Sequence, residues 1–475
     1  MLSLFISIPF LSLIAFNIPW KRSGQLAFFW SGVLFLAQAV LALLFSIGAV
    51  DPSAMQLSRI FIFKLSLDPL SLLMLLSIGI VAFVTLLAAN ILISEKGQKG
   101  NFINLLMVAV TGMNATVLAA DLFSVYVFME VVAVSSFVLI SIQKDRLALE
   151  GAFKYMIMSW VATALMLTSI ALIILTCGDT DFSVIASGLS AQSGNPLVKL
   201  AIGLFLCGLF IKSGVVPFHG WLPDAYSAAP SAVSILLAGI ITKVTGVYVL
   251  MRLVISVFGL NSSIQNILMF AGTVSIIFGA LAALTQHDFK RMLAYSSISQ
   301  IGYIILGLGC GTPLGLAGAA FHFFNHAMFK SLLFVNAAAV EKQAGTVHMD
   351  NLGGLAAKMP LTGTTSVIAL LSTAGIPPLS GFWSKLIIIT ALWSAGKFAY
   401  AYIAITFSVV TLAYFLSMQR RVFFGKLQTG LEAVKEAGLG ITIPSALLAA
   451  ITVAAGIGFP WVLDKLILPI QFILK

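Results

Sequence analysis

Hydrophobic runs of about 20 residues recur along the whole of this 475-residue sequence. A helix rises about 1.5 Å per residue, so a run of that length crosses the roughly 30 Å of hydrocarbon in a bilayer. Backbone groups in lipid must be hydrogen-bonded within the protein, and the runs are continuous rather than alternating, which favours helices over barrel strands. The sequence therefore predicts an all-α, polytopic membrane protein, and its 60% hydrophobic content excludes a water-soluble enzyme.

The spans are placed from the apolar runs and from the charged residues that separate them. We expect about fourteen spans, at approximately residues 2–20, 26–50, 70–94, 102–120, 122–142, 155–176, 197–216, 231–256, 262–285, 293–310, 316–340, 361–397, 398–418 and 441–463. The first run is followed, and not preceded, by basic residues, Lys21 and Arg22, the reverse of a secretory signal peptide. The positive-inside rule then puts both termini on the outer face of a cell inner or plasma membrane.

Two of the expected spans are interrupted by glycine and proline. Residues 361–397 are too long for one straight crossing and contain Pro377 and Pro378 near their middle. Residues 197–216 are followed at once by Pro217, in a stretch too polar for lipid. Proline removes a backbone donor and kinks or ends a helix, so the seventh and twelfth spans should be broken helices. Two interrupted spans about five spans apart are typical of transporters with internal repeats.

Five ionisable residues lie inside the apolar runs. They are Glu130, Lys212, Lys243, Lys330 and Lys385. A charged side chain at the centre of a bilayer costs at least about 2.5 kcal/mol, so it normally faces water or a partner. Glu130 and Lys212 could form an ion pair that only fastens two helices together. One carboxylate cannot neutralise four lysines, however, and a buried lysine can load and release protons, so we expect these residues to lie on a proton path.

Two histidines share a helix face with one of these lysines. His322, His326 and Lys330 are spaced i, i+4 and i+8, with Asn325 alongside. Histidine exchanges protons near neutral pH, so this face is predicted to be a proton relay. The alternatives are a pair of satisfied core histidines or a zinc site, and no cysteine or carboxylate in the run supports zinc. We therefore expect no metal.

Polar residues between the spans allow two further interpretations. His219 and Asp224 follow the seventh span and could form an entrance for cytoplasmic protons or only a solvated loop. The cluster at residues 287–291, with one histidine, one aspartate, one lysine and one arginine, is better explained as a loop that fixes topology than as a site.

Several classes of function are excluded by what the sequence lacks. The three cysteines, Cys177, Cys207 and Cys310, have no C-x-x-C spacing, so the chain should carry no redox centre of its own. No phosphate-binding or dinucleotide-binding glycine motif occurs, so no cofactor is expected. The net charge of +10 comes from basic residues scattered between spans, which the positive-inside rule explains better than nucleic-acid binding does.

Five motifs together resemble one protein family. The sequence is similar to the antiporter-like subunits shared by respiratory complex I, the membrane-bound energy-converting hydrogenases and the multisubunit sodium/proton (Mrp-type) antiporters. The likeness runs from about residue 60 to 420 and is carried, in the family's order, by LFSVYVFMEVVAVSSFVLIS, IKSGVVPFHGWLPDAYSAAPSAVSILLAGIITKVTGVY, HDFKRMLAYSSISQIGY, FHFFNHAMFKSLLF and STAGIPPLSGFWSKL.

The resemblance implies a role for each buried ionisable residue. It makes Glu130 the carboxylate of the fifth span and Lys212 the lysine of the broken seventh span. Lys243 becomes the connecting lysine of the eighth span, and Lys385 the terminal group of the broken twelfth. The central relay would consist of His322, His326 and Lys330.

The resemblance also implies an organisation and a set of partners. Residues 101–258 and 259–420 would be two inverted five-helix repeats, preceded by three helices in 1–100 and followed by a cytoplasmic loop and a last span in 421–475. The chain would translocate protons inside a larger complex, with lipid, other membrane subunits, further antiporter-like subunits and a peripheral iron-sulfur arm as partners. Any enzymatic step would belong to a dehydrogenase or hydrogenase partner.

Other functions stay open at this point, among them a quinone-reactive enzyme subunit, which the absence of any cofactor motif disfavours. The chain could belong to a stand-alone multisubunit sodium/proton antiporter with no electron transfer. It could also be a structural membrane anchor whose buried charges only fasten helices, in which case changing Lys243 should have mild effects.

Overall fold

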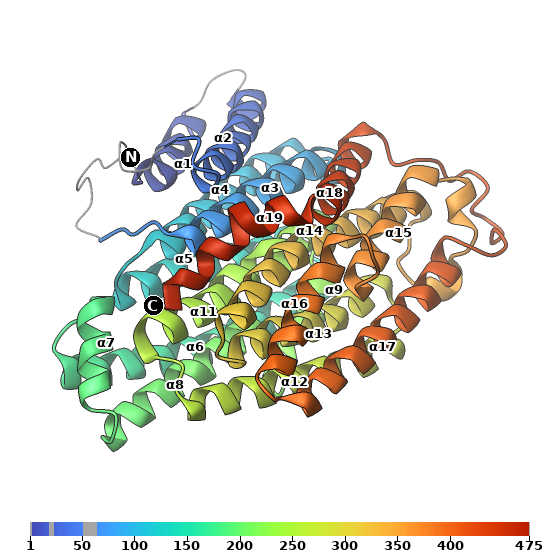
Figure 1. Cartoon of the computed structure of the whole chain (residues 1–475). Coiled ribbons are helices and arrows are strands. Elements are labelled where there is room, and N and C mark those ends of the chain that lie inside the picture. Colours follow the sequence, from blue (N-terminus) through green and yellow to red (C-terminus); the bar gives the residue numbers. More distant parts are fainter. Residues whose placement is uncertain (1, 19–22, 51–63, 475) are drawn as a thin grey trace.

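The computed structural model describes residues 2–18, 23–50 and 64–474 as a bundle of helices (Figure 1). Met1, Lys475 and the basic pair Lys21 and Arg22, on which the expected orientation depends, lie outside the described residues. Within the described ranges, strand pairing is limited to isolated bridges such as Leu65 with Ala119. The predicted all-α class is confirmed.

Most helices of the first half follow one another with short connections, except that 22 residues separate Ser46 at the end of α2 from Pro69 at the start of α3. They are α1 (Leu4–Phe16), α2 (Ser23–Ser46), α3 (Pro69–Leu92), α4 (Lys96–Leu118), α5 (Leu122–Ile140), α6 (Arg146–Cys177), α7 (Phe182–Ala191), α8 (Pro196–Ser213) and α9 (Trp221–Ala228). A continuous helical stretch over Ser231–Phe258 then contains α10 (Ser231–Leu236) and α11 (Val249–Leu253), with π-helical segments at Leu237–Ile241, Lys243–Tyr248 and Val254–Phe258.

The second half of the chain also consists of helices. Its helices are α12 (Ser262–Leu284), α13 (Phe289–Gly309), α14 (Pro313–Ala344), α15 (Pro360–Ala374), α16 (Ser380–Ser394), α17 (Phe398–Val422), α18 (Leu439–Ile457) and α19 (Phe459–Val462). Short 3₁₀ turns lie between α14 and α15, and a π-helical and a 3₁₀ segment follow α19.

Short acidic side chains begin many of the helices. Asp68, Asp121, Asp145 and Asp288 each accept a hydrogen bond from the backbone N–H three residues later, at 2.7–2.9 Å. Such caps satisfy N–H groups that have no partner within the helix. Aspartates that look like loop charges in the sequence therefore fix where the spans begin.

Eleven helices among the described residues are long and apolar enough to cross a membrane. The three other expected spans correspond to α1, which has 13 residues, to α14, whose buried polar side chains make it less apolar, and to the pair α15 and α16. The protein is a multi-pass membrane protein, and its count of about fourteen spans stays a prediction. The amphipathic helix α7 was not foreseen.

Both predicted breaks are present. The seventh run ends at Ser213, Gly214 takes a left-handed conformation (φ 67°), and helix resumes only at Trp221. The twelfth run is split in the same way, because α15 ends at Ala374, Gly375 has φ 84°, and α16 begins at Ser380. Glycine adopts these angles without the strain that a Cβ would cause.

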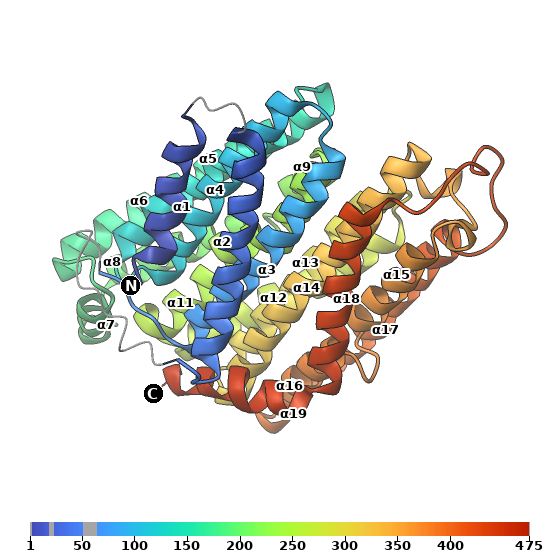
Figure 2. The same cartoon turned by 90° about the horizontal axis from the view of Figure 1, so that it is seen from above.

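The most deeply buried helices lie in the middle of the bundle. The span Ser231–Phe258 is buried from Ala232 to Val254, and α14 is buried from Gly315 to Val340. Figures 1 and 2 show α6, α7 and α8 at one end of the molecule and α15 and α17 at the opposite end, with α13 and α14 between them. The helices that carry the predicted site residues therefore follow one another along the length of the bundle.

A buried ion pair joins the start of α3 to α11. Arg252 is only 6% exposed and donates from both terminal nitrogens to the carboxylate of Asp68, with Nη2 to Oδ1 at 2.8 Å. The same guanidinium also donates to Ser71 and Tyr248. From the sequence alone Arg252 would be assigned to a loop, because no neighbouring residue indicates that Asp68 lies opposite it.

We expect Asp68→Asn to lower the stability of the protein by about 3 kcal/mol, because it leaves the buried guanidinium of Arg252 without its counter-charge. Thermal unfolding of the purified protein in detergent measures this. The matched control is Asp464→Asn, which removes an exposed ion pair with Lys465 and should change little. If Asp68→Asn unfolds at the wild-type temperature, the pair does not hold α3 to α11.

Candidate functional site

Glu130 and Lys212 form the predicted ion pair. The Nζ atom of Lys212, on α8, lies 2.9 Å from Oε1 of Glu130, on α5. The ammonium group also donates to Oγ of Ser159 at 2.6 Å, and the hydroxyl of Thr163 donates to the same carboxylate oxygen at 2.7 Å. Ser159 and Thr163 lie on α6, so three helices hold the pair in one geometry.

The two members of the pair differ in their access to the surroundings. The side chain of Lys212 is 1% exposed, whereas that of Glu130 is 23% exposed. Around Glu130 the outward face of α5 carries Val127, Val131 and Val134, which are all exposed. A neighbouring chain could therefore contact Glu130 without reaching Lys212.

The broken end of α8 explains how Lys212 is accommodated. Lys212 lies in the last turn of α8, where the helix dipole and the free carbonyl groups favour a positive charge. One of these carbonyl groups, on Ile211, accepts a hydrogen bond from the indole N–H of Trp221 at 2.9 Å. The break thus supplies polar backbone next to the charge.

Lys243 lies on the buried π-helical segment and has no exposed surface. Its ammonium group donates to the backbone carbonyl of Ala238 in the same helix. No carboxylate lies within ion-pair distance of it in the described part of the chain. A π-helical turn leaves carbonyl groups available to side chains, and such turns are frequent at functional sites.

Two glycines place the Lys243 helix between α8 and α14. A Cβ on Gly246 would lie 2.6 Å from the backbone nitrogen of Ser213, the neighbour of Lys212. A Cβ on Gly239 would clash with Oγ of Ser331, the neighbour of Lys330. Neither position has room for a larger residue, so close contacts bring Lys243 between the other two lysines.

The predicted relay residues of α14 are all buried and point to different neighbours. Nδ1 of His322 lies 2.9 Å from Oγ of Ser384 on α16. Nζ of Lys330 donates to the carbonyl of Leu293 on α13 at 2.9 Å. The rings of His322 and His326 are stacked with centroids 6.4 Å apart. The shared face of α14 therefore connects α13 with α16.

Several buried polar atoms around this face have no hydrogen-bond partner among the described residues. They are Nε2 of His322, both ring nitrogens of His326, both side-chain amide atoms of Gln300, and the hydroxyls of Ser213 and Ser331. Buried polar groups in proteins are normally hydrogen-bonded, either to protein or to ordered water. Polar sites with several such groups are the places where internal water is found.

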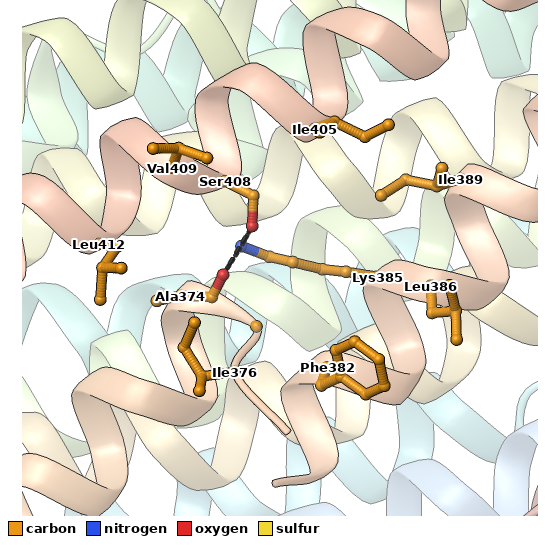
Figure 3. Close-up of a pocket in the computed structure, with 11 residues that line it drawn as sticks. Ala374, Ile376, Phe382, Lys385, Leu386, Ile389, Ile405, Ser408, Val409 and Leu412 are labelled. Atoms are coloured by element: carbon orange, nitrogen blue, oxygen red, sulfur yellow. Dashed lines mark hydrogen bonds between the residues drawn. The ribbon is translucent and has the colours of Figure 1, made fainter. Parts of the chain in front are cut away.

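Lys385 lies at the second break. Figure 3 shows its side chain pointing between Ala374 and Ser408, with Nζ 3.4 Å from the carbonyl of Ala374 and 3.2 Å from Oγ of Ser408. The ammonium group is also 4.5 Å from the centre of the Tyr303 ring. A cavity of about 210 Å³ borders Lys385, and its wall includes the exposed residue Val409 of α17. This end of the site therefore reaches the surface of the chain.

The structure brings the predicted residues into two groups. Lys330 shares the α14 face with His326, whereas Lys243 and Lys385 come near it through neighbouring residues, since Gly239 packs on Ser331 and Ser384 contacts His322. Lys212 instead has Glu130 as its charged neighbour. The two groups meet where Ser213 contacts Gly246.

The hydroxyl groups that complete the site were missed in the sequence. Ser159, Thr163, Ser384, Ser408 and Tyr303 bind or border the ionisable groups. Each is an ordinary polar residue within an apolar run, and helices bond many such hydroxyls to their own carbonyls. Spacing alone could not have distinguished them.

The loop residues interpreted in the sequence are tied to one another. Asp224 accepts hydrogen bonds from Lys154 at 2.7 Å and from Arg291 at 2.6 Å, which joins α9 to α6 and α13. His287 lies 2.6 Å from Asp350, and this hydrogen bond holds the pKa of the Asp350 carboxyl below its usual value. These contacts agree with a role in fixing the loops. The proton entrance at Asp224 stays a prediction.

Lys290, in the same cluster, was not expected to be buried. It is 2% exposed and donates to the carbonyl of Ala229 at 2.9 Å, with Glu341 at 3.5 Å.

No group of three histidine, cysteine, aspartate or glutamate side chains that could hold a metal ion occurs among the described residues.

Fold and site together define a polytopic membrane protein with ionisable groups buried between its helices and beside two helix breaks. Residues 119–411 match the family described as NADH:quinone oxidoreductase/Mrp antiporter, transmembrane. The chain belongs to this family, which confirms the resemblance seen in the motifs.

Individual relatives cover most of the chain. It is 30% identical to an NADH-quinone oxidoreductase subunit of Desulforudis audaxviator, over 96% of this chain and 92% of the relative. It is 31% identical to a Na(+)/H(+) antiporter subunit of Alkalihalophilus pseudofirmus, over 82% of this chain and 79% of the relative. A chain of the Mrp complex from Dietzia sp. has the same fold, with a TM-score of 0.90, 24% identity and coverage of 100% and 97%.

We expect ordered water at the unpartnered atoms of the α14 face, because both ring nitrogens of His326 otherwise lack hydrogen bonds. A high-resolution cryo-EM map of the protein in its complex should show water density within hydrogen-bond distance of His326 and Gln300. The variant His326→Leu should lose the water at residue 326 and keep the fold. A dry, well-ordered map around wild-type His326 would contradict this expectation.

Proposed function

We propose that the chain is a proton-translocating, antiporter-like subunit of a multisubunit membrane complex. The observation that carries this proposal is the contact of Glu130 with Lys212, in which a fully buried lysine at a helix break is paired with a carboxylate that partners can reach. The relatives named as part of a quinone oxidoreductase and as part of an antiporter support the same class of function.

The first step of the proposed mechanism is a change in the Glu130 and Lys212 contact. At 2.9 Å the carboxylate stabilises the protonated lysine. If a neighbouring chain pulls Glu130 away, Lys212 becomes a buried ammonium without a counter-charge, which is costly in a medium of low dielectric. The proton then moves on. When Glu130 returns, Lys212 takes up a new proton from the cytoplasmic side, because the carboxylate again stabilises its charged form.

The following steps use the second group of residues. In this proposal Lys243 receives the proton, the face with His322, His326 and Lys330 passes it on, and Lys385 releases it. The hydrogen bonds of Lys243 and Lys330 to backbone carbonyls hold these lysines without fixing their charge through a carboxylate. Water bridges between neighbouring members complete the path, because a bridging water is nearly as favourable as a direct hydrogen bond.

The proposed organisation places one break in each repeat. We assign residues 101–258 and 259–420 to two inverted five-helix repeats, with 1–100 before them and 421–475 after them. The breaks after α8 and after α15 support this division, since each half contains one. We further propose that both termini face outward and that the protein lies in the cell inner or plasma membrane.

The driving energy in this proposal comes from partner chains. We infer that the partners are other membrane subunits, including further antiporter-like subunits, and a peripheral iron-sulfur arm if the complex is redox-linked. The antiporter relative favours a second candidate, membership of a stand-alone sodium/proton antiporter. The proteins that co-purify with the chain distinguish the two, because only the redox-linked complex contains iron-sulfur subunits.

Glu130→Gln should abolish proton transport and leave assembly intact, because the amide keeps the shape of the side chain and loses the charge that holds Lys212. Glu130→Asp should retain part of the activity, since the charge survives at shorter reach. Proton uptake into proteoliposomes that contain the purified complex measures both. The control Glu150→Gln removes an exposed carboxylate near the same helices and should transport normally. Wild-type transport by Glu130→Gln would rule out the switch.

Lys243→Leu and His326→Leu should each reduce the rate of net proton transfer by at least about tenfold, because every member of a relay is necessary. Neither residue contacts Glu130, so a helix-fastening role for the buried charges predicts mild effects instead. The same proteoliposome assay decides between these two functions. Lys199→Gln, at the exposed start of α8, is the matched lysine control and should have no effect.

A further inference from the structure

A large cavity lies where α2, α3 and α4 meet, away from the residues of the proposed proton path. Its volume is about 1020 Å³, and its lining includes Gly24 and Phe28 of α2, Asn90 beside the end of α3, and Lys96 and Lys99 of α4. None of the seven residues assigned to the proton path lines it. The proposed function therefore leaves this cavity without a role.

One side of the cavity is positively charged. Lys99 donates to the backbone oxygen and Oδ1 of Asn90, at 2.7 and 3.3 Å, which leaves one of its three N–H donors free. Lys96 is exposed, and neither lysine has a carboxylate within ion-pair distance among the residues that the structure describes. A third lysine, Lys342, is close by, since its Nζ donates to the carbonyl of Ile91.

The start of α4 adds to this positive character. Glu95 precedes the helix but its side chain makes no capping hydrogen bond, and the first bond within the helix comes from the N–H of Lys99. The N–H groups of the first turn are therefore without helical acceptors, and a 23-residue helix places the positive end of its dipole here. Glu95, the acidic residue beside the cavity, is exposed to solvent.

Apolar side chains form part of the remaining wall, and the cavity is open. Leu86, Phe102 and Ile103 are buried residues of its wall, and Phe28 is half-buried. Gly24 and Gly100 also line it, and a Cβ added to either would meet no atom within 4 Å. The cavity thus joins a basic end to an apolar wall next to the ends of membrane-spanning helices.

We propose that this cavity binds an anionic phospholipid. Its phosphate would lie between Lys96 and Lys99 at the start of α4, and an acyl chain would lie against Phe28 of α2. Basic pockets between transmembrane helices match such headgroups in both charge and position. A free anion would leave the apolar wall unused, and a zwitterionic lipid would bring a further positive charge to the basic end of the cavity.

Photolabelling tests this proposal on the chain in its native complex, reconstituted into nanodiscs. Phosphatidylglycerol with a photoactivatable acyl chain should label peptides of α2, α3 and α4, and the matching phosphatidylcholine should not. The double variant Lys96→Gln/Lys99→Gln should reduce labelling about tenfold, since each lysine contributes to binding of an anionic headgroup. Gly100→Leu, which keeps both charges and fills the space, should reduce it as well. The control Lys426→Gln/Lys435→Gln, two exposed loop lysines, should label like wild type.

The other outcomes overturn the proposal. Equal labelling by phosphatidylcholine means that the cavity does not select charge. Protection by inorganic phosphate as strong as that by unlabelled phosphatidylglycerol identifies a free-anion site. Absence of label on α2, α3 and α4, with crosslinks from this face to another protein of the complex, means that a protein segment fills the cavity.

Discussion

Charged and polar groups buried between apolar helices must find partners inside the chain, and the arrangement around the site follows from that requirement. Lys212 has the carboxylate of Glu130, whereas Lys243 and Lys330 rest on backbone carbonyls. Carbonyl groups become available only where regular helix is interrupted or where another helix presents one. The π-helical span supplies such a carbonyl group to Lys243, the second helix break supplies one to Lys385, and α13 presents one to Lys330.

In the proposed mechanism, the lysine with a carboxylate partner holds its proton, whereas the lysines with carbonyl partners can pass a proton on. A carboxylate at 2.9 Å favours one protonation state of Lys212, so its removal changes that state. A carbonyl oxygen accepts a hydrogen bond from a lysine in either state. The proposed relay, in which one member has an ionic partner and the others do not, is suited to being switched at one end, where the side chain of Glu130 is 23% exposed.

The basic residues at the cavity beside Lys96 and Lys99 lie in a different environment from those of the proposed proton path. Lysines of the proposed path are buried, whereas Lys96 is exposed beside an apolar wall. In the sequence both kinds appear as isolated basic residues near apolar runs. The buried lysines lie in the middle of an apolar run, whereas Lys96 and Lys99 lie at the end of one.

The sequence by itself determined the helical class, the two breaks and the burial of four lysines and two histidines within the runs, because run length, proline and mid-run charge act locally. Glu130 could be matched with Lys212 through the family motifs. Only the tertiary structure decided that Asp68 neutralises Arg252, that Ser159 and Thr163 complete the Glu130 pair, and that Lys290 is buried. These contacts join helices far apart in the chain, and the spacing of residues along one helix carries no information about which helix will lie opposite.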